Sequence, residues 1–140
     1  MKRVSQLTAL ALLCGLASLS STAADMPHSL TLDQLQAQNG AVIDTRVSAF
    51  YNGWPQTLSG TSGHEPAALN LSASWLGAMS DEQLSGWAKQ HRLTPDMPVA
   101  LYGNDDDNQT VKARLEKAGF THVSTLSDAL QQSDRLQRSE

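Results

Sequence analysis

The chain has 140 residues, enough for one domain with a modest core of its own. It carries 10 Lys and Arg side chains against 14 Asp and Glu side chains, a formal net charge of −4. This acidic balance argues against nucleic acid and anionic membrane surfaces as partners, because both attract clustered positive charge.

The first 24 residues have the three parts of a secretory signal. Lys2 and Arg3 are followed by an apolar run over 7–16 and by small residues over 20–24, which is typical of a signal-peptidase site. The apolar run is shorter than the roughly 20 residues that span a bilayer, so it predicts cleavage and export rather than an anchor. We therefore expect a periplasmic protein that has no membrane attachment after cleavage of residues 1–24.

Cleavage would also remove Cys14, the only cysteine of the chain. The processed chain would then have no disulfide and no thiolate nucleophile. It would carry 8 basic against 14 acidic side chains, a net charge of −6. We expect its domain to cover residues 25–130, and the polar residues 131–140 to form a linker or a disordered tail.

The first predicted elements of this domain are a helix and a strand. Residues 30–40 carry leucines at helical spacing, begin with Thr31 or Asp33 as a cap, and end at Asn-Gly, which predicts a short helix. AVID at 41–44 predicts a brief buried strand, and 45–67 is a long polar stretch interrupted by glycine and proline. Three aromatic side chains of this stretch either anchor it to the core or contact a ligand: Phe50, Tyr51 and Trp54.

Strands and helices alternate in the rest of the chain. The predicted elements are, in order, a strand at 68–71, a helix over 80–91, a strand at 98–102, a helix over 110–119 and a strand at 122–126. Ser80 followed three residues later by Gln83 is a capping-box pattern. Alternation of this kind predicts an α/β fold with a mainly parallel sheet and helices on both of its faces.

Four motifs follow one another along these elements. A strand ending in Asp-x-Arg (AVIDTR) precedes GHEPAALNL, and PVALYG and ARLEKAGFTHVSTL come after it. Each motif is weak alone, but their order and spacing over about residues 30–130 resemble the rhodanese family. The resemblance implies a rhodanese-like fold with a mainly parallel central sheet, and kinship with the thiosulfate sulfurtransferases. In that family PVALYG would be the active-site strand, and ARLEKAGFTHVSTL the last helix and strand.

The resemblance also implies structural roles for a set of signature residues. These are Asp44, Arg46, Gly63, His64, Pro66 and Asn70. Asp44 can accept backbone N–H groups and pair with Arg46, while Gly63 and Pro66 set a turn that leads into the next strand. His64 is a candidate general base, but we favour a structural hydrogen-bonding role for it.

The chain departs from the family at the position of the nucleophile. Rhodaneses take the sulfane sulfur of thiosulfate onto a cysteine as a persulfide, and the alignment places Gly103 where that cysteine stands. No atom of Gly103 can attack, so we expect no catalytic residue here. Three carboxylates next to this position oppose a thiosulfate dianion, although they interact favourably with a helix dipole. The vestigial loop consists of Tyr102, Gly103, Asn104, Asp105, Asp106, Asp107 and Asn108.

The predicted secretory signal and three further segments indicate a particular branch of this family. LTLDQLQ, FYNGWPQTL and LNLSASWL are similar to the N-terminal, non-catalytic domain of periplasmic thiosulfate sulfurtransferases built from several rhodanese domains. This implies a docking or structural module whose partners are further rhodanese domains, in cis or in trans. It also implies that the chain is inactive alone and needs no cofactor and no metal.

An alternative function rests on the acidic loop itself. Asp105, Asp107, Gln109 and Glu116 fall at positions one, three, five and twelve of a calcium-binding EF-hand loop. Thr110 stands where that loop requires glycine, and a predicted strand precedes the loop, so we do not favour this site. The alternative that stays open is a periplasmic module that binds a small ligand or a cation through residues 104–109.

Overall fold

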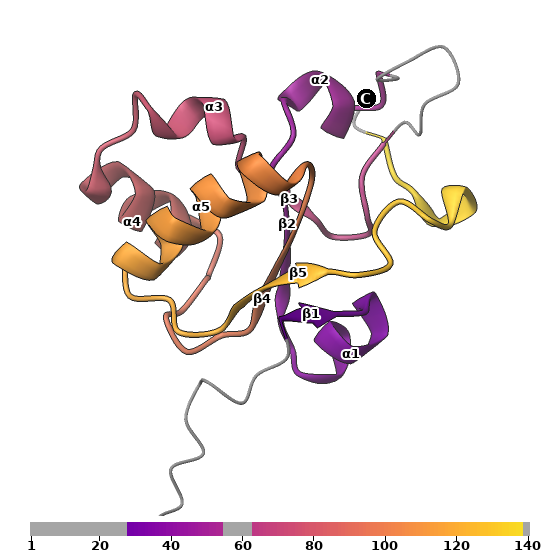
Figure 1. Cartoon of the computed structure of the whole chain (residues 1–140), viewed down its shortest axis with the longest axis horizontal. Helices are drawn as coiled ribbons and strands as arrows, with labels where there is room; N and C mark the ends of the chain where they lie inside the picture. The colour runs from indigo at the N-terminus through magenta and orange to yellow at the C-terminus, as the bar shows by residue number, and fades with distance from the viewer. Residues whose placement is uncertain (1–27, 55–62, 139–140) are drawn as a thin grey trace, which may run out of the picture.

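The computed structural model describes residues 28–54 and 63–138 of the chain. They form a five-stranded sheet with helices packed on both of its faces (Figure 1). The predicted secretory signal, including Cys14, lies outside the described residues, and so does part of the expected polar stretch at 45–67.

The strands of the sheet run in the order β1-β5-β4-β2-β3, and every pair of neighbours is parallel. Their bounds are β1 Ser29–Leu30, β2 Ala41–Asp44, β3 Leu69–Asn70, β4 Val99–Tyr102 and β5 Val123–Leu126. The predicted α/β class with a parallel sheet is therefore confirmed. Strand β1 was not predicted, because a two-residue strand has no periodicity to detect and depends on its pairing with β5.

The described residues contain five α-helices and a short 3₁₀ helix. They are α1 Leu32–Ala37, α2 Ser48–Tyr51, α3 Ala73–Leu76, α4 Asp81–Gln90, α5 Asp105–Lys117 and the 3₁₀ helix η2 Ser133–Arg135. The side chains of Thr31 and Ser80 each close a capping box, which fixes the starts of α1 and α4. The single turns α2 and α3 were not predicted, because neither has a side-chain cap.

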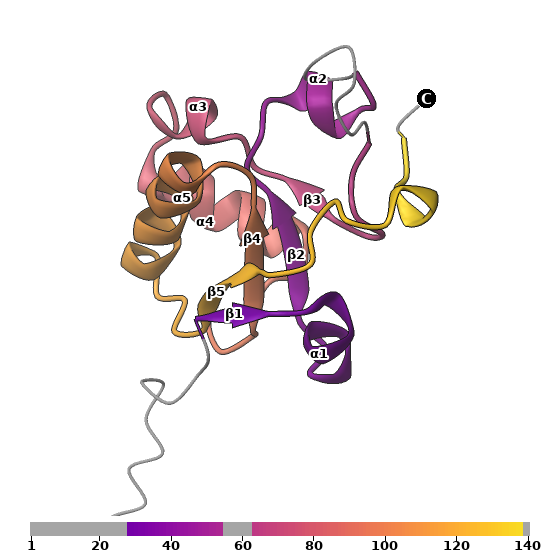
Figure 2. The same cartoon turned by 45° about the vertical axis from the view of Figure 1, so that its right-hand side comes forward.

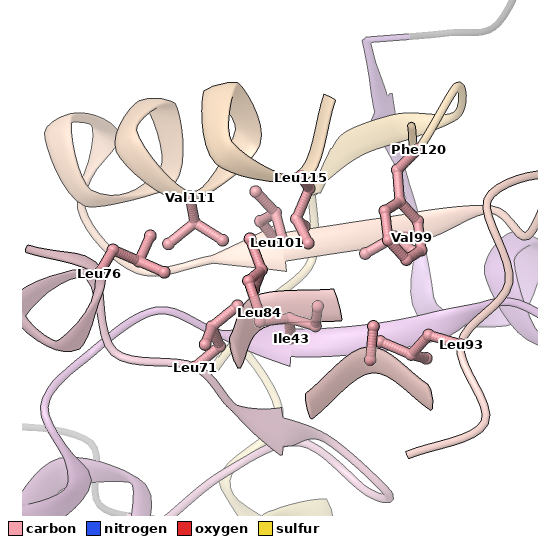
Figure 3. Packing of buried hydrophobic residues seen from close by; sticks show 11 residues of the cluster. Ile43, Leu71, Leu76, Leu84, Leu93, Val99, Leu101, Val111, Leu115 and Phe120 are labelled. Carbon is pink, nitrogen blue, oxygen red and sulfur yellow. The ribbon is translucent and has the colours of Figure 1, made fainter. Parts of the chain in front are cut away.

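The sheet separates two hydrophobic clusters. Ile43 and Leu101 face α4 and α5, and Figure 3 shows Val111 and Leu115 of α5 pointing toward Leu101. Val42, by contrast, belongs to the cluster on the opposite face, where α1 packs (Figure 2). Successive side chains along β2 thus point to opposite faces of the sheet and contribute to both hydrophobic clusters. Among the described residues, no helix combines the length and the apolar character that a membrane crossing requires.

The helix after β4 differs from its predicted extent. It was expected over 110–119, but it begins at Asp105 and ends at Lys117. Asn104 accepts a hydrogen bond from the backbone N–H of Asp107 at 2.7 Å and so caps the helix five residues earlier than apolar spacing suggested. The acidic residues therefore form the first turn of α5.

Candidate functional site

The signature motifs meet at the carboxyl ends of three neighbouring strands. Asp44 at the end of β2 stands opposite Tyr102 at the end of β4 and opposite Asn70 at the end of β3. Loops that leave a parallel sheet at this edge are the usual place for ligands in α/β folds. The sequence-predicted residues of β2, β3 and β4 are thus brought together.

Asp44 and Arg46 form a buried ion pair in the loop after β2. Arg46 donates from Nη2 to Oδ2 of Asp44 at 2.6 Å and from Nε to Oδ1 at 3.0 Å, and its backbone N–H also reaches Oδ1. The side chains are 0% exposed for Asp44 and 3% exposed for Arg46. Burial opposes the charge of Arg46, but the hydrogen bonds and the charge of Asp44 outweigh burial and raise its pKa.

Other signature residues hold this loop in place. Arg46 also donates to the carbonyl of Gly63 at 2.7 Å and lies over the ring of Tyr102, 5.4 Å from its centre. Asn70 donates through Nδ2 to the carbonyls of Asp44 and Arg46 at 3.1 and 2.9 Å. These contacts leave the guanidinium of Arg46 engaged with the protein itself.

Residues 63–66, which we call the GHEP segment, pair with the last part of the described chain. His64 and Gln137 exchange backbone hydrogen bonds of 2.8 Å in both directions. Gly63 has a φ of +94°, and a Cβ there would lie 2.5 Å from the carbonyl oxygen of Gln137, so the position requires glycine. Pro66 follows in the same segment and is half-buried.

His64 is buried among structural partners. Its Nδ1 lies 2.7 Å from the carbonyl oxygen of Tyr51, and its ring stacks on the ring of Tyr51 with centres 3.8 Å apart. The hydroxyl of Tyr51 in turn donates to the carbonyl of Ala68 at 2.6 Å. Tyr51 and His64 therefore link α2 to the GHEP segment and the start of β3.

Sequence reasoning missed a second buried ion pair, that of Glu65 with Arg135. Nε of Arg135 lies 2.6 Å from Oε2 of Glu65 and Nη2 lies 3.0 Å from Oε1, which also accepts the backbone N–H of Leu130. The Glu65 side chain is 0% exposed. No sequence signal connects the two, because they are 70 residues apart.

Tyr102 lies between the two ion pairs. Its hydroxyl accepts the backbone N–H of Glu65 at 2.9 Å, and its ring lies beside Arg46. Burial and then the nearby charge of Asp44 raise the pKa of Tyr102 well above its usual value. Tyr102 therefore stays a neutral phenol in the folded chain.

The position expected for a nucleophile is filled by neighbouring side chains. Gly103 follows Tyr102 with a φ of +154°, and a Cβ built on it would overlap with Oγ1 of Thr45. Thr45 is fully buried, and its hydroxyl lies 2.8 Å from Oδ1 of Asn108 and 3.1 Å from the carbonyl of Tyr102. Thr45, which sequence reasoning also missed, thus occupies the space that a side chain at 103 needs.

The acidic part of the loop is helical. Asp105 and Asp106 are exposed in the first turn of α5, and Asp107 is bound to Asn104. Because α5 is continuous, the positions expected for an EF-hand lie along a helix and not around a loop, so this idea is wrong. Within 28–54 and 63–138, no three His, Cys, Asp or Glu side chains gather as a metal site would require.

A groove of about 490 Å³ lies along one side of α5. Asp105, Asn108 and Gln109 line it from the acidic loop, and Leu101 belongs to its apolar lining. The other lining residues are His28, Lys112, Ala113, Glu116 and Thr125. The groove offers hydrogen-bonding groups of both charges to a small polar molecule.

The comparisons with known proteins agree with this geometry. The model of the family described as Rhodanese-like domain matches residues 29–132. Thiosulfate sulfurtransferase YnjE of Escherichia coli strain K12 is 69% identical over 138 residues, which make up 99% of this chain and 32% of that relative. The chain therefore spans about a third of the length of the curated relative that it matches.

Two solved structures extend the comparison. The crystal structure of YnjE has a TM-score of 0.77 and 70% identity, covering 79% of this chain and 27% of that chain. An anaerobic ergothioneine biosynthesis enzyme from Chlorobium limicola has a TM-score of 0.59 and 26% identity, covering 70% of this chain and 24% of that chain. Both similarities confirm the fold that the sequence motifs indicate.

Proposed function

Because this chain belongs to the rhodanese family, and a thiosulfate sulfurtransferase is 69% identical to it over 138 residues, we propose a specific role for it. It is an exported rhodanese-like domain that carries no persulfide chemistry itself. It serves as a docking or structural module for a catalytic rhodanese domain, in cis or in trans.

The observation that carries the proposal is the filled space at Gly103. A persulfide requires a cysteine thiolate, and the resemblance of PVALYG to the active-site strand of the family assigns the cysteine to this position. Here the position has no side chain, and Thr45 stands where a Cβ would be. A cysteine at this position would therefore require the hydroxyl of Thr45 to move from its present place at the end of β4.

The electrostatics of the same edge support the proposal. Asp105 and Asp106 are exposed in the turn that follows Gly103, and carboxylates near a bound dianion or thiolate disfavour both. Arg46 offsets them little, because its charge is paired with that of Asp44 and its one unpartnered nitrogen, Nη1, is buried. A site of this kind stabilises the fold but does not attract thiosulfate.

A sulfur-transfer assay tests the absence of catalysis. The purified chain without residues 1–24 is given thiosulfate and cyanide, and thiocyanate is measured. We expect no turnover above that of a heat-inactivated sample, and no adduct of about +32 Da in the intact mass after exposure to thiosulfate. Turnover, or such an adduct, would refute the proposal.

Export is tested separately by expression of all 140 residues in a bacterium with a periplasm. The tripartite pattern of residues 1–24 supports cleavage there. We expect the chain in the periplasmic fraction, with a mass that lacks about 24 residues. An uncleaved chain in the cytoplasm would contradict this part of the proposal.

The groove along α5 favours a second candidate function, the binding of a small polar ligand. Asp105, Asn108 and Gln109 bring part of the acidic loop 104–109 into this groove. A thermal-shift screen of metal salts and small polar molecules tests it, since a ligand that binds only the folded chain raises the melting temperature. A shift that survives in Gln109→Ala with Lys112→Ala would place the ligand elsewhere.

A further inference from the structure

Three large hydrophobic side chains are exposed within the described part of the chain. All three lie in segments that follow the carboxyl ends of β2 and β3. Val47 is 43% exposed, Trp54 is 70% exposed and Trp75 is 40% exposed. A protein of this size rarely leaves two tryptophans in water without a use, because aromatic side chains dominate the energetics of interfaces. We call these three residues the docking face.

The docking face sits at the carboxyl edge of the sheet, around the vestigial site. Val47 directly follows Arg46 and immediately precedes α2, while Trp75 lies in α3, which begins just after β3. The backbone N–H of Ala73 donates to the carbonyl of Thr45 at 3.1 Å and joins the two segments. In both views α2 and α3 stand at the same end of the sheet (Figures 1 and 2).

These side chains are presented on a fixed backbone. The N–H of Trp54 donates to the carbonyl of Ala49 at 2.9 Å, and that of Trp75 donates to the carbonyl of Ser72 at 3.0 Å. Ordering them at an interface therefore requires little loss of backbone entropy. Tryptophan is also enriched among the residues that dominate binding energy at interfaces.

We infer that the docking face binds a second rhodanese-like domain, an inference that rests on the function proposed above. The matched relative is about three times as long as the matched region, so this chain corresponds to one part of that relative. The described chain also runs to this face, because carbon atoms of Arg138 pack at Gly53, next to Trp54.

The charge around the docking face specifies the partner further. Asp105 and Asp106 lie exposed at the same carboxyl edge, in the first turn of α5. A complementary surface would be apolar at its centre, to cover Trp54 and Trp75, and would carry Arg or Lys at its rim. Replacing the rim carboxylates should mainly alter the salt dependence of docking, since exposed charges are screened by salt.

A chimera tests the inference in a full-length protein. This chain replaces the matching third of the E. coli relative, to which it is 69% identical, and unfolding is followed by calorimetry. A docked domain unfolds together with the rest of the protein in one transition. Val47→Ser with Trp75→Ser should split this transition in two and enlarge the radius of gyration in X-ray scattering.

The control variant changes exposed residues of α4. Lys89→Ser with Gln90→Ser should leave the single transition and the radius of gyration unchanged, because surface substitutions away from an interface have small effects. An unsplit transition in the Val47 and Trp75 variant would overturn the inference. So would an equal fall in the melting temperature of the isolated chain, since the two residues would then act within the domain.

Two more measurements separate the remaining outcomes. Sedimentation of the isolated chain should give a monomer, and a dimer that dissociates in the Val47 and Trp75 variant would assign the face to a second copy and overturn the inference. The sulfur-transfer assay on the isolated chain tests catalysis only. Activity there would refute the proposed function, whereas the calorimetry would still decide whether the face docks.

Discussion

The two ion pairs of this domain differ in how far apart their partners lie in the sequence. Asp44 at the end of β2 and Arg46 in the loop after it are two residues apart, whereas Glu65 and Arg135 are 70 residues apart. The first pair shapes the loop after β2, and the second attaches the η2 segment to the GHEP segment. A local pair can be predicted from a motif, but a distant pair is visible only once the chain is folded.

Burial also differs between the pairs. Both side chains of the first pair are enclosed, with Arg46 3% exposed, whereas Arg135 of the second pair is 17% exposed. Water can therefore partly solvate the cation of the second pair and, after its removal, approach Glu65. Loss of the cation in the second pair should be less damaging than loss of Asp44 in the first, because removal of the partly exposed Arg135 uncovers Glu65 to water, whereas removal of the enclosed Asp44 leaves Arg46 enclosed.

The largest effect is expected for Asp44→Ala. This variant leaves the guanidinium of Arg46 buried without its anion, which should lower the free energy of unfolding by about 3–5 kcal/mol. Urea denaturation followed by tryptophan fluorescence measures the change, with the exposed Asp96→Ala as control. A loss below about 1 kcal/mol would mean that this pair behaves as a surface pair does.

A smaller effect is expected for Arg135→Ala. Glu65 is itself 0% exposed, but it keeps the N–H of Leu130, and removal of the 17% exposed Arg135 side chain opens a path for water to it. We therefore expect a loss of about 2–3 kcal/mol, with Lys89→Ala as the control. A loss larger than that of Asp44→Ala would reverse the comparison. Glu65→Leu with Arg135→Leu should recover much of the loss, because no buried charge then lacks a partner.

Elements with a strong local pattern could be predicted, and those that depend on distant contacts could not. The capping boxes of α1 and α4 and the apolar runs of β2 and β4 made these elements recognisable. The turns α2 and α3 lack such caps, and β1 exists only through its pairing with β5.

The candidate site divides in the same way. The motifs indicated the Asp44 and Arg46 contact and the missing nucleophile at Gly103. Thr45 stood within the quoted motif, yet its contact with position 103 crosses from β2 to β4 and becomes visible only in the folded sheet. Likewise, Arg135, the partner of Glu65, lies within residues 131–140, which we expected to be a linker or a disordered tail because they are polar.

A third prediction concerns the contact between Gly103 and Thr45, which joins the residues that follow two neighbouring strands, β4 and β2. Gly103→Ala should lower the free energy of unfolding by about 1–3 kcal/mol, because the added Cβ overlaps with Oγ1 of Thr45 and must adopt a positive φ. Gly103→Ala with Thr45→Ala should lose less than the sum of the single variants, since the overlap is then removed. Additive losses would show that the two positions do not interact.

The smallest effect concerns Tyr102, which touches both ion pairs. Tyr102→Phe removes the acceptor for the N–H of Glu65 and should lower the free energy of unfolding by about 1 kcal/mol at neutral pH. Burial, followed by the charge of Asp44, raises the pKa of Tyr102, so the folded chain keeps a proton that the unfolded chain releases above pH of about 10.

The stability that depends on this proton is complete below pH of about 10 and falls as the pH rises further, by at most about 1.4 kcal/mol per pH unit. Above pH 10 the unfolding free energy of the unchanged chain should therefore decline more steeply than that of Tyr102→Phe. Urea denaturation at a series of alkaline pH values measures the two slopes. Equal slopes would mean that Tyr102 has the same pKa in the folded and the unfolded chain. Burial and the charge of Asp44 would then not act on its hydroxyl as the structure indicates.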